Sequence, residues 1–209
     1  MRPVGFSLLT ATGFSTGMVL FALGAYHPPL LPLRIAGAAC AAIALAAALA
    51  TENRPLGLLG LTRPKSRAWV FLPLCVAVGL AAAIAYRRGQ GRPLWPVELT
   101  GFCLASAAIG AAEEIAYRGF VQGQLRRWGP FVACVGAAAA HTAYKCSLFA
   151  IPAVPDRPDM LVLGLGTLIG GVLFGIMRES LGSVAFPLSA HVAFDIVVYG
   201  DLAALPWWV

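Results

Sequence analysis

Long apolar runs alternate with short segments of prolines, glycines and arginines along the whole chain of 209 residues. Each run is close to the roughly 20 residues that an α-helix needs to cross the hydrocarbon core of a bilayer. None shows the alternation of apolar and polar positions that is typical of membrane β-strands. We therefore predict an all-α, polytopic transmembrane helical bundle with about seven spans, within a range of six to eight.

The predicted helices end at prolines, glycines or arginine-rich turns. They cover residues 4–25, 34–50, 68–86, 96–118, 130–149, 159–177 and 184–199, and two shorter segments, 55–61 and 120–128, are expected to lie at the membrane interface. Residues 178–183 are expected to form a short turn between the last two helices. No linker is long enough to divide the chain, so we predict a single integral-membrane domain over residues 1–209.

Composition supports a membrane protein and argues against a nucleic-acid partner. The chain is 59% hydrophobic and only 11% charged, which is too few charges to cover the surface of a soluble domain of this size. The net charge of +6 comes largely from loop arginines, as expected at a membrane surface. The arginine distribution favours a cytoplasmic N-terminus, and the Ala-rich, compact chain is typical of a bacterial cytoplasmic (inner) membrane protein. We expect the first helix to remain uncleaved, because no small-residue cleavage pattern follows it.

The cysteines give neither a disulfide framework nor a thiolate metal site. They are scattered and odd in number: Cys40, Cys75, Cys103, Cys134 and Cys146. We interpret them as small apolar residues of helices. Cys146 lies five residues beyond His141, but nothing around it in the sequence would activate its thiol, so we do not favour it as a nucleophile.

Ionisable residues inside the predicted spans gather in three helices. They are Glu113, Glu114 and Arg118 in the fourth, His141 in the fifth, and His191 and Asp195 in the seventh. A charge near a bilayer centre costs roughly 2.5–3.5 kcal/mol on insertion scales, so such residues usually face a bundle interior or a water-filled cavity. We therefore take these six residues as the candidate functional site.

Helical spacing indicates how some of these residues are arranged. Glu114 and Arg118 are four positions apart and can pair on one face of a helix, as can His191 and Asp195. Glu113 is rotated by about 100° from Glu114, which lets one carboxylate face Arg118 while the other faces a cavity. Carboxylates and histidines together supply the groups of a general base, an electrophilic stabiliser and possible metal ligands.

Each of these residues also has a purely structural interpretation. The Glu114–Arg118 pair could simply hold helices in register, and a single His141 could be a hydrogen-bonded core residue. Proton-coupled transporters use the same residue types inside the membrane. Other intramembrane protease chemistries find no support, because the chain has no HExxH or GxSxG motif, and Asp156 and Asp159 lie outside convincing spans.

Three short motifs resemble those of the CPBP intramembrane proteases, also called the CAAX-protease and bacteriocin-processing, or Abi, family. Glu113-Glu114-Ile115-Ala116-Tyr117-Arg118 is similar to the family's EExxxR motif, and His191-Val192-Ala193-Phe194-Asp195 is similar to its HxxxN or HxxxD motif. His141 stands where the FxxxH motif has its histidine, although Ala137 replaces the phenylalanine. The resemblance covers residues 96–199, the predicted protease core.

The resemblance implies an intramembrane endopeptidase. In family terms, Glu113 and His141 activate a water molecule, and His191 with Asp195 stabilises the tetrahedral oxyanion. Glu114 with Arg118 would mainly position these groups. The substrate would be a membrane-anchored protein or peptide, cut near its C-terminus or anchor, and a bacterial member could sort C-terminal anchors of surface proteins. A transporter, immunity factor or scaffold without catalysis is the alternative.

The same resemblance leaves the cofactor open. A water-attack mechanism needs only a carboxylate and a preorganised oxyanion site, so no cofactor is required. If zinc is used, its ligands would come from Glu113, His141, His191 and Asp195, whose side chains suit that metal.

Overall fold

The computed structural model describes residues 3–25, 27–151 and 159–202, and in these segments all regular secondary structure is helical. The main helices are α1 (Val4–Leu23), α2 (Leu31–Ala50), α4 (Leu72–Gly89), α5 (Gly101–Glu114), α7 (Pro130–Leu148), α8 (Met160–Leu181) and α9 (Ala185–Tyr199). A short α3 (Pro55–Leu58) follows α2, and α5 continues through a π-helical segment (Ile115–Val121) into α6 (Gln122–Leu125). The predicted all-α fold is confirmed.

Four segments are long and apolar enough to cross a membrane by length and composition. They are Val4–Leu23, Pro28–Ala50, Ser66–Gly89 and Met160–Leu181. The other main helices, α5, α7 and α9, and the π-helical continuation of α5 contain the six candidate site residues. The described helices thus agree with about seven spans, and the polar residues are concentrated in the helices that are less apolar or shorter.

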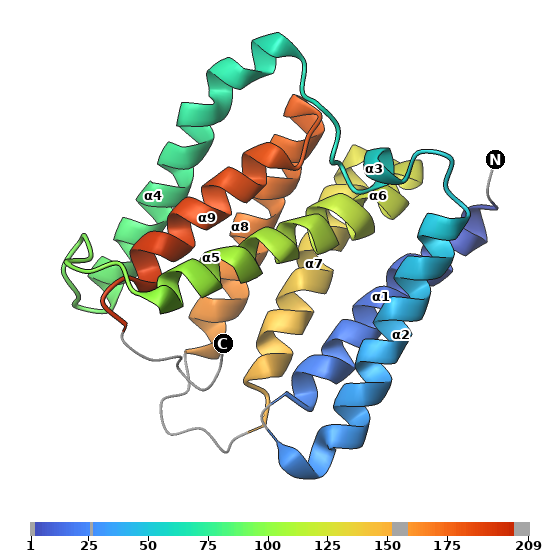
Figure 1. Cartoon of the computed structure of the whole chain (residues 1–209), viewed down its shortest axis with the longest axis horizontal. Coiled ribbons are helices and arrows are strands. Elements are labelled where there is room, and N and C mark those ends of the chain that lie inside the picture. The colour runs from blue at the N-terminus through green and yellow to red at the C-terminus, as the bar shows by residue number, and fades with distance from the viewer. Residues whose placement is uncertain (1–2, 26, 152–158, 203–209) are drawn as a thin grey trace.

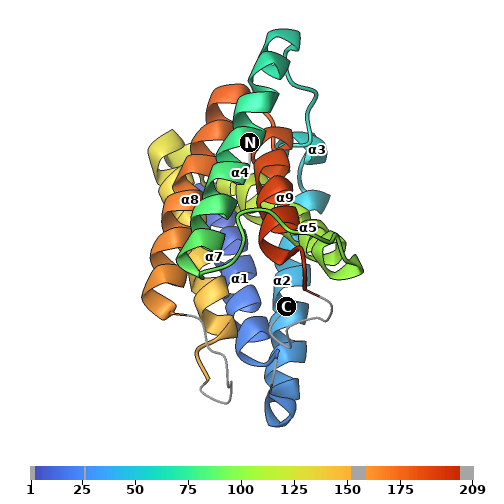
Figure 2. The same ribbon diagram turned by 90° about the vertical axis from the view of Figure 1, so that its left-hand side faces the viewer.

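The helices pack mainly in pairs around the diagonal α5 (Figures 1 and 2). The α1–α2 pair lies on one side of α5, and α4 packs against α9 on the other. The α7–α8 pair completes the bundle, and α5 also packs along α9. This arrangement encloses the C-terminal half of α5 and its π-helical continuation.

Glycines allow several of these helices to approach closely, as expected where helices pack in a membrane. A Cβ atom at Gly17 would lie 2.6 Å from the backbone nitrogen of Ala41, so this glycine sets the spacing of α1 and α2. A Cβ atom at Gly79 would overlap the carbonyl oxygen of Ala190, so α4 is in backbone contact with α9. Because His191 follows Ala190, the α4–α9 contact also fixes the position of a candidate site residue.

The helix predicted over residues 96–118 begins later, at Gly101. The backbone N–H groups of Val97 and Glu98 donate hydrogen bonds to Asp201 Oδ1, at 2.6 and 2.9 Å, and Thr100 Oγ1 donates one to the carbonyl of Leu202. These contacts bind the segment before α5 to the chain just beyond α9. The predicted start was wrong because these N–H groups are satisfied by tertiary partners, which periodicity does not reveal.

The boundary between the last two helices also differs from the prediction. The residues expected as a turn from Arg178 onward form the last turn of α8, which ends at Leu181. Gly182 then adopts a left-handed conformation (φ 75°) and its N–H donates to the carbonyl of Arg178. This is a common way for a helix to end, because glycine has no Cβ penalty at positive φ.

Residues 55–61, one of the two segments predicted to lie at the interface, form α3 and the turn that follows it. We call residues 55–61 the strap. Gly119 and Gly123 allow it to approach, since a Cβ atom at either position would overlap a carbonyl oxygen of α3 or of the residue after it. The carbonyl of Gly60 accepts a 2.9 Å hydrogen bond from the N–H of Val184 and one of 3.3 Å from Ser183 Oγ. The strap therefore connects the helix that carries the carboxylates with the start of α9.

The Gly79 contact yields a stability prediction. Gly79→Ala should destabilise the protein by roughly 1–3 kcal/mol, because the added methyl group forces α4 and α9 apart. Gly89→Ala is the matched control on the same helix, since nothing lies within 4 Å of a Cβ atom there. Thermal unfolding of the two variants in detergent measures the difference. Equal stability of the two variants would contradict the close α4–α9 contact.

Candidate active site

The six candidate residues meet at one place inside the bundle. Their exposed fractions are small: Glu113 6%, Glu114 0%, Arg118 1%, His141 3%, His191 9% and Asp195 4%. They come from α5 with its π-helical continuation, from α7 and from α9. The sequence analysis took these six residues of three predicted helices as one candidate site, and the structure brings all of them together.

Glu113 faces α7. Its Oε2 lies 3.2 Å from His141 Nε2, and its Oε1 lies 2.6 Å from Lys145 Nζ. His191 Nε2 is 4.0 Å from the same Oε2, beyond direct hydrogen-bond distance. Glu113 therefore presents one oxygen to a lysine and the other to two histidine rings.

Glu114 is rotated from Glu113 about the helix axis and faces Arg118, as the spacing predicted. Its Oε1 accepts hydrogen bonds from Arg118 Nη1 at 3.0 Å and His191 Nδ1 at 2.7 Å. The predicted Glu114–Arg118 pair is thus present and fully buried. Glu114 also links α5 to α9 by orienting the ring of His191.

Arg118 determines the tautomer of His141. Its Nη1 lies 2.9 Å from His141 Nδ1, and a guanidinium group can only donate. His141 Nδ1 must therefore accept this hydrogen bond, which leaves the ring proton on Nε2. His141 Nε2–H then donates to Glu113 Oε2, so one arginine orients both a carboxylate and a histidine.

The predicted contact between His191 and Asp195 is only a loose one. His191 Nε2 lies 3.8 Å from Asp195 Oδ2, longer than a hydrogen bond. Gly110 of α5 makes room for this pair, since a Cβ atom at that position would overlap Asp195 Oδ2. Asp195 therefore lies against the backbone of α5, on the side of His191 Nε2.

A π-helical segment begins directly after the two glutamates. Such segments are rare and often occur at functional sites. The side chains of Tyr117, Arg118, Phe120 and Val121 are all buried here, because the helix is surrounded by its neighbours. The Tyr117 ring stacks on His141 with a centroid distance of 4.5 Å, so Tyr117 packs against the functional ring and not against lipid.

Lys145 is the site residue that sequence reasoning missed. It lies in the last turn of α7, where a lysine is usually interpreted as an interfacial or helix-capping residue. The available signal was its position four residues after His141, which places both side chains on one face of the helix. Cys146, the next residue, is a free cysteine that is only partly buried.

The donor atoms do not fit a zinc site as they are arranged. Among the residues that the structure describes, no group of three or more His, Cys, Asp or Glu side chains is placed to hold a metal ion. Two of the candidate ligands already contact cationic side chains of the protein. Lys145 lies against Glu113, and Arg118 donates a hydrogen bond to His141 Nδ1. In this arrangement the four candidate ligands do not form a zinc site.

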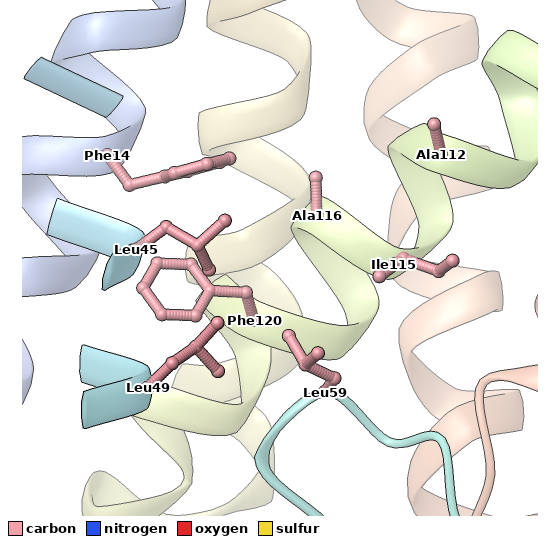
Figure 3. Close-up of a pocket in the computed structure, with 8 residues that line it drawn as sticks. All are labelled: Phe14, Leu45, Leu49, Leu59, Ala112, Ile115, Ala116 and Phe120. Atoms are coloured by element: carbon pink, nitrogen blue, oxygen red, sulfur yellow. The ribbon is translucent and has the colours of Figure 1, made fainter. Parts of the chain in front are cut away.

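An apolar pocket of about 190 Å³ lies beside the same helix (Figure 3). It is lined only by apolar side chains, from α1, α2, α5, the π-helical segment and the strap: Phe14, Leu45, Leu49, Leu59, Ala112, Ile115, Ala116 and Phe120. It offers no side-chain group that could bind a polar reactant. This pocket therefore differs from the carboxylate and histidine cluster, which contains the polar groups.

Comparison with known families agrees with the site. Residues 95–197 match the family described as type II CAAX prenyl endopeptidase Rce1-like, which confirms the family suspected from the three motifs. The matched segment includes all six candidate residues and Lys145. No curated protein and no solved structure matches the chain.

The buried Arg118–Glu114 pair yields a second prediction. Arg118→Met should destabilise the protein by about 3–5 kcal/mol, because the buried Glu114 carboxylate loses its paired cation and keeps only the hydrogen bond from His191. Adding Glu114→Gln should recover part of this loss, since no isolated charge then remains. Thermal unfolding in detergent measures both effects, with the exposed Arg88→Met as control. A stable but inactive Arg118→Met protein would instead indicate a direct catalytic role.

Proposed function

We propose that this chain, whose residues 95–197 belong to the Rce1-like family of type II CAAX prenyl endopeptidases, is an intramembrane endopeptidase that uses Glu113 as general base. The observation that carries the proposal is the buried Glu113–His141 contact, with Glu113 Oε2 3.2 Å from His141 Nε2. A positioned base of this kind contributes typically about 10²–10⁴-fold to a reaction rate.

The reaction requires a water molecule between the base and the scissile carbonyl. Glu113 Oε2 and His191 Nε2 are 4.0 Å apart, a separation that a single bridging water can span. Glu113 takes a proton from this water as the water oxygen bonds to the carbonyl carbon. The same proton then passes to the leaving amine as the carbon–nitrogen bond breaks, which regenerates the carboxylate.

His191 and Asp195 stabilise the oxyanion that forms when water adds to the scissile carbonyl. His191 Nδ1–H donates to Glu114, so the ring can also donate from Nε2 only when both nitrogens carry protons. Glu114 and Asp195 then supply negative charge on either side of the ring. A donor that is fixed before the reaction stabilises the developing oxyanion without reorganisation.

The proposed substrate is a membrane-anchored protein or peptide that is cleaved near its C-terminus or anchor. The bundle supports this, because a buried site between membrane-spanning helices is reached from within or beside the bilayer. Sorting of C-terminal anchors of surface proteins is the role we favour within a bacterial inner membrane.

A non-catalytic membrane protein is the competing function. It would use the same cluster as a proton relay or structural network, as the residue types alone permit. The different partners of the two carboxylates favour the protease. Arg118 pairs with Glu114, while Glu113 keeps one oxygen, Oε2, facing two histidines.

Neutralising the base tests the proposal. Glu113→Gln, and separately His141→Ala, should lower cleavage of a membrane-anchored reporter peptide by at least about 10²-fold while the protein still inserts and accumulates. Glu98→Gln is the control, since it removes an exposed carboxylate outside the site. If either site variant cleaves at the wild-type rate, the assignment is wrong. A wild-type protein that does not cleave the reporter, with the same changes reducing only abundance or having no effect, would favour the scaffold.

Metal analysis of the purified, active protein distinguishes a metal-free mechanism from one that uses zinc. We expect zinc far below one equivalent, and cleavage that persists after treatment with a chelator, because Lys145 and Arg118 already neutralise the carboxylates. Stoichiometric zinc that disappears in His191→Ala would overturn this expectation and establish a metal site.

A further inference from the structure

We propose that Lys145 is a positioning residue that fixes the orientation of the Glu113 carboxylate, and this inference rests on the proposed function. None of the three family-like motifs includes Lys145. Its Nζ nevertheless lies 2.6 Å from Glu113 Oε1, which is closer than His141 Nε2 lies to the other oxygen, at 3.2 Å.

The contact distinguishes the two oxygens of the base. Oε1 is held by Lys145, whereas Oε2 faces His141 Nε2 and, at 4.0 Å, His191 Nε2. A free carboxylate can rotate about its terminal bond and exchange the two oxygens, because this torsion is broad. The ammonium group and the His141 ring together restrict that rotation, so that one defined oxygen faces the reacting region.

Lys145 and His141 act from the same helix. They are four residues apart on α7, so both side chains reach the glutamate from one face. Any movement of α7 relative to α5 would therefore disturb both partners of Glu113 together. The contribution of α7 to the site is thus one helix face that carries both His141 and Lys145, and the histidine motif includes only His141.

A simple stabilising role is the competing explanation. Lys145 occupies the last turn of α7, where any basic residue interacts favourably with the helix dipole. Its ammonium also lies 5.9 Å from the Tyr144 ring centroid, a favourable but weak contact. Neither of these contacts requires the lysine to reach Glu113, and neither predicts an effect on turnover.

The positioning role predicts an effect on turnover with substrate binding unchanged. A misplacement of about 1 Å in a catalytic group can cost on the order of 10²-fold in rate. Lys145→Met keeps most of the length and the apolar stem of the side chain but removes the charge. It should therefore lower kcat by roughly 10–100-fold and leave KM within about twofold, because the proposed role of Lys145 involves no contact with the substrate.

Kinetics of purified Lys145→Met, Lys145→Arg and the exposed control Arg88→Met on the reporter peptide test the proposal. Lys145→Arg should have a kcat at least about tenfold higher than Lys145→Met, since it returns a cation beside Glu113. Arg88→Met should match the wild type, because Arg88 lies on the exposed surface of α4.

Three outcomes would overturn the positioning role: an unchanged kcat in Lys145→Met, a rise in KM alone, or an arginine variant no better than methionine. A loss confined to the amount of folded protein, with kcat per folded molecule unchanged, would overturn it as well. Glu113→Gln measured in parallel separates this inference from the proposed function. An inactive Glu113→Gln beside a fully active Lys145→Met rejects only the role of the lysine, whereas an active Glu113→Gln rejects Glu113 as the general base.

Discussion

The buried guanidinium group of Arg118 is the contact on which the rest of the site depends. It donates to Glu114 at 3.0 Å and to His141 Nδ1 at 2.9 Å, while only 1% exposed. Two adjacent buried carboxylates are costly unless they are paired and hydrogen-bonded. Arg118 compensates one of them directly. Because it can only donate, it also leaves His141 with its proton directed at the other.

The surrounding helices are shaped to hold this arrangement. Gly171 on α8 lies against Arg118, since a Cβ atom there would be 2.9 Å from Nη2. Gly110 makes the corresponding space for Asp195, and Gly79 brings α4 against the residue before His191. Small residues that look like ordinary membrane packing in the sequence are therefore placed where charged groups need room. Fold and site depend on the same close helix contacts.

Much of this could be predicted from the sequence, because its two main signals are local. Apolar runs predicted the helices, and spacing along one helix predicted that Glu114 meets Arg118 while Glu113 faces elsewhere. The partners across helices were less accessible. His191 donates a hydrogen bond to Glu114 of α5, whereas Asp195 of its own helix lies 3.8 Å away. The position of His191 is therefore determined by the packing of α9 on α5, which spacing along α9 does not reveal. Lys145 resembled an ordinary helix-end lysine, and the π-helical segment has no distinct hydrophobic period.

The protonation state of His141 is the most direct test of the central claim that Arg118 fixes the site. Nitrogen NMR of protein labelled at its histidines measures it, with His141→Ala used to assign the signal. A neutral ring with its proton on Nε2 is predicted, because Nδ1 accepts from Arg118 and Nε2–H donates to Glu113. A proton on Nδ1, in either a neutral or a doubly protonated ring, would contradict the arrangement.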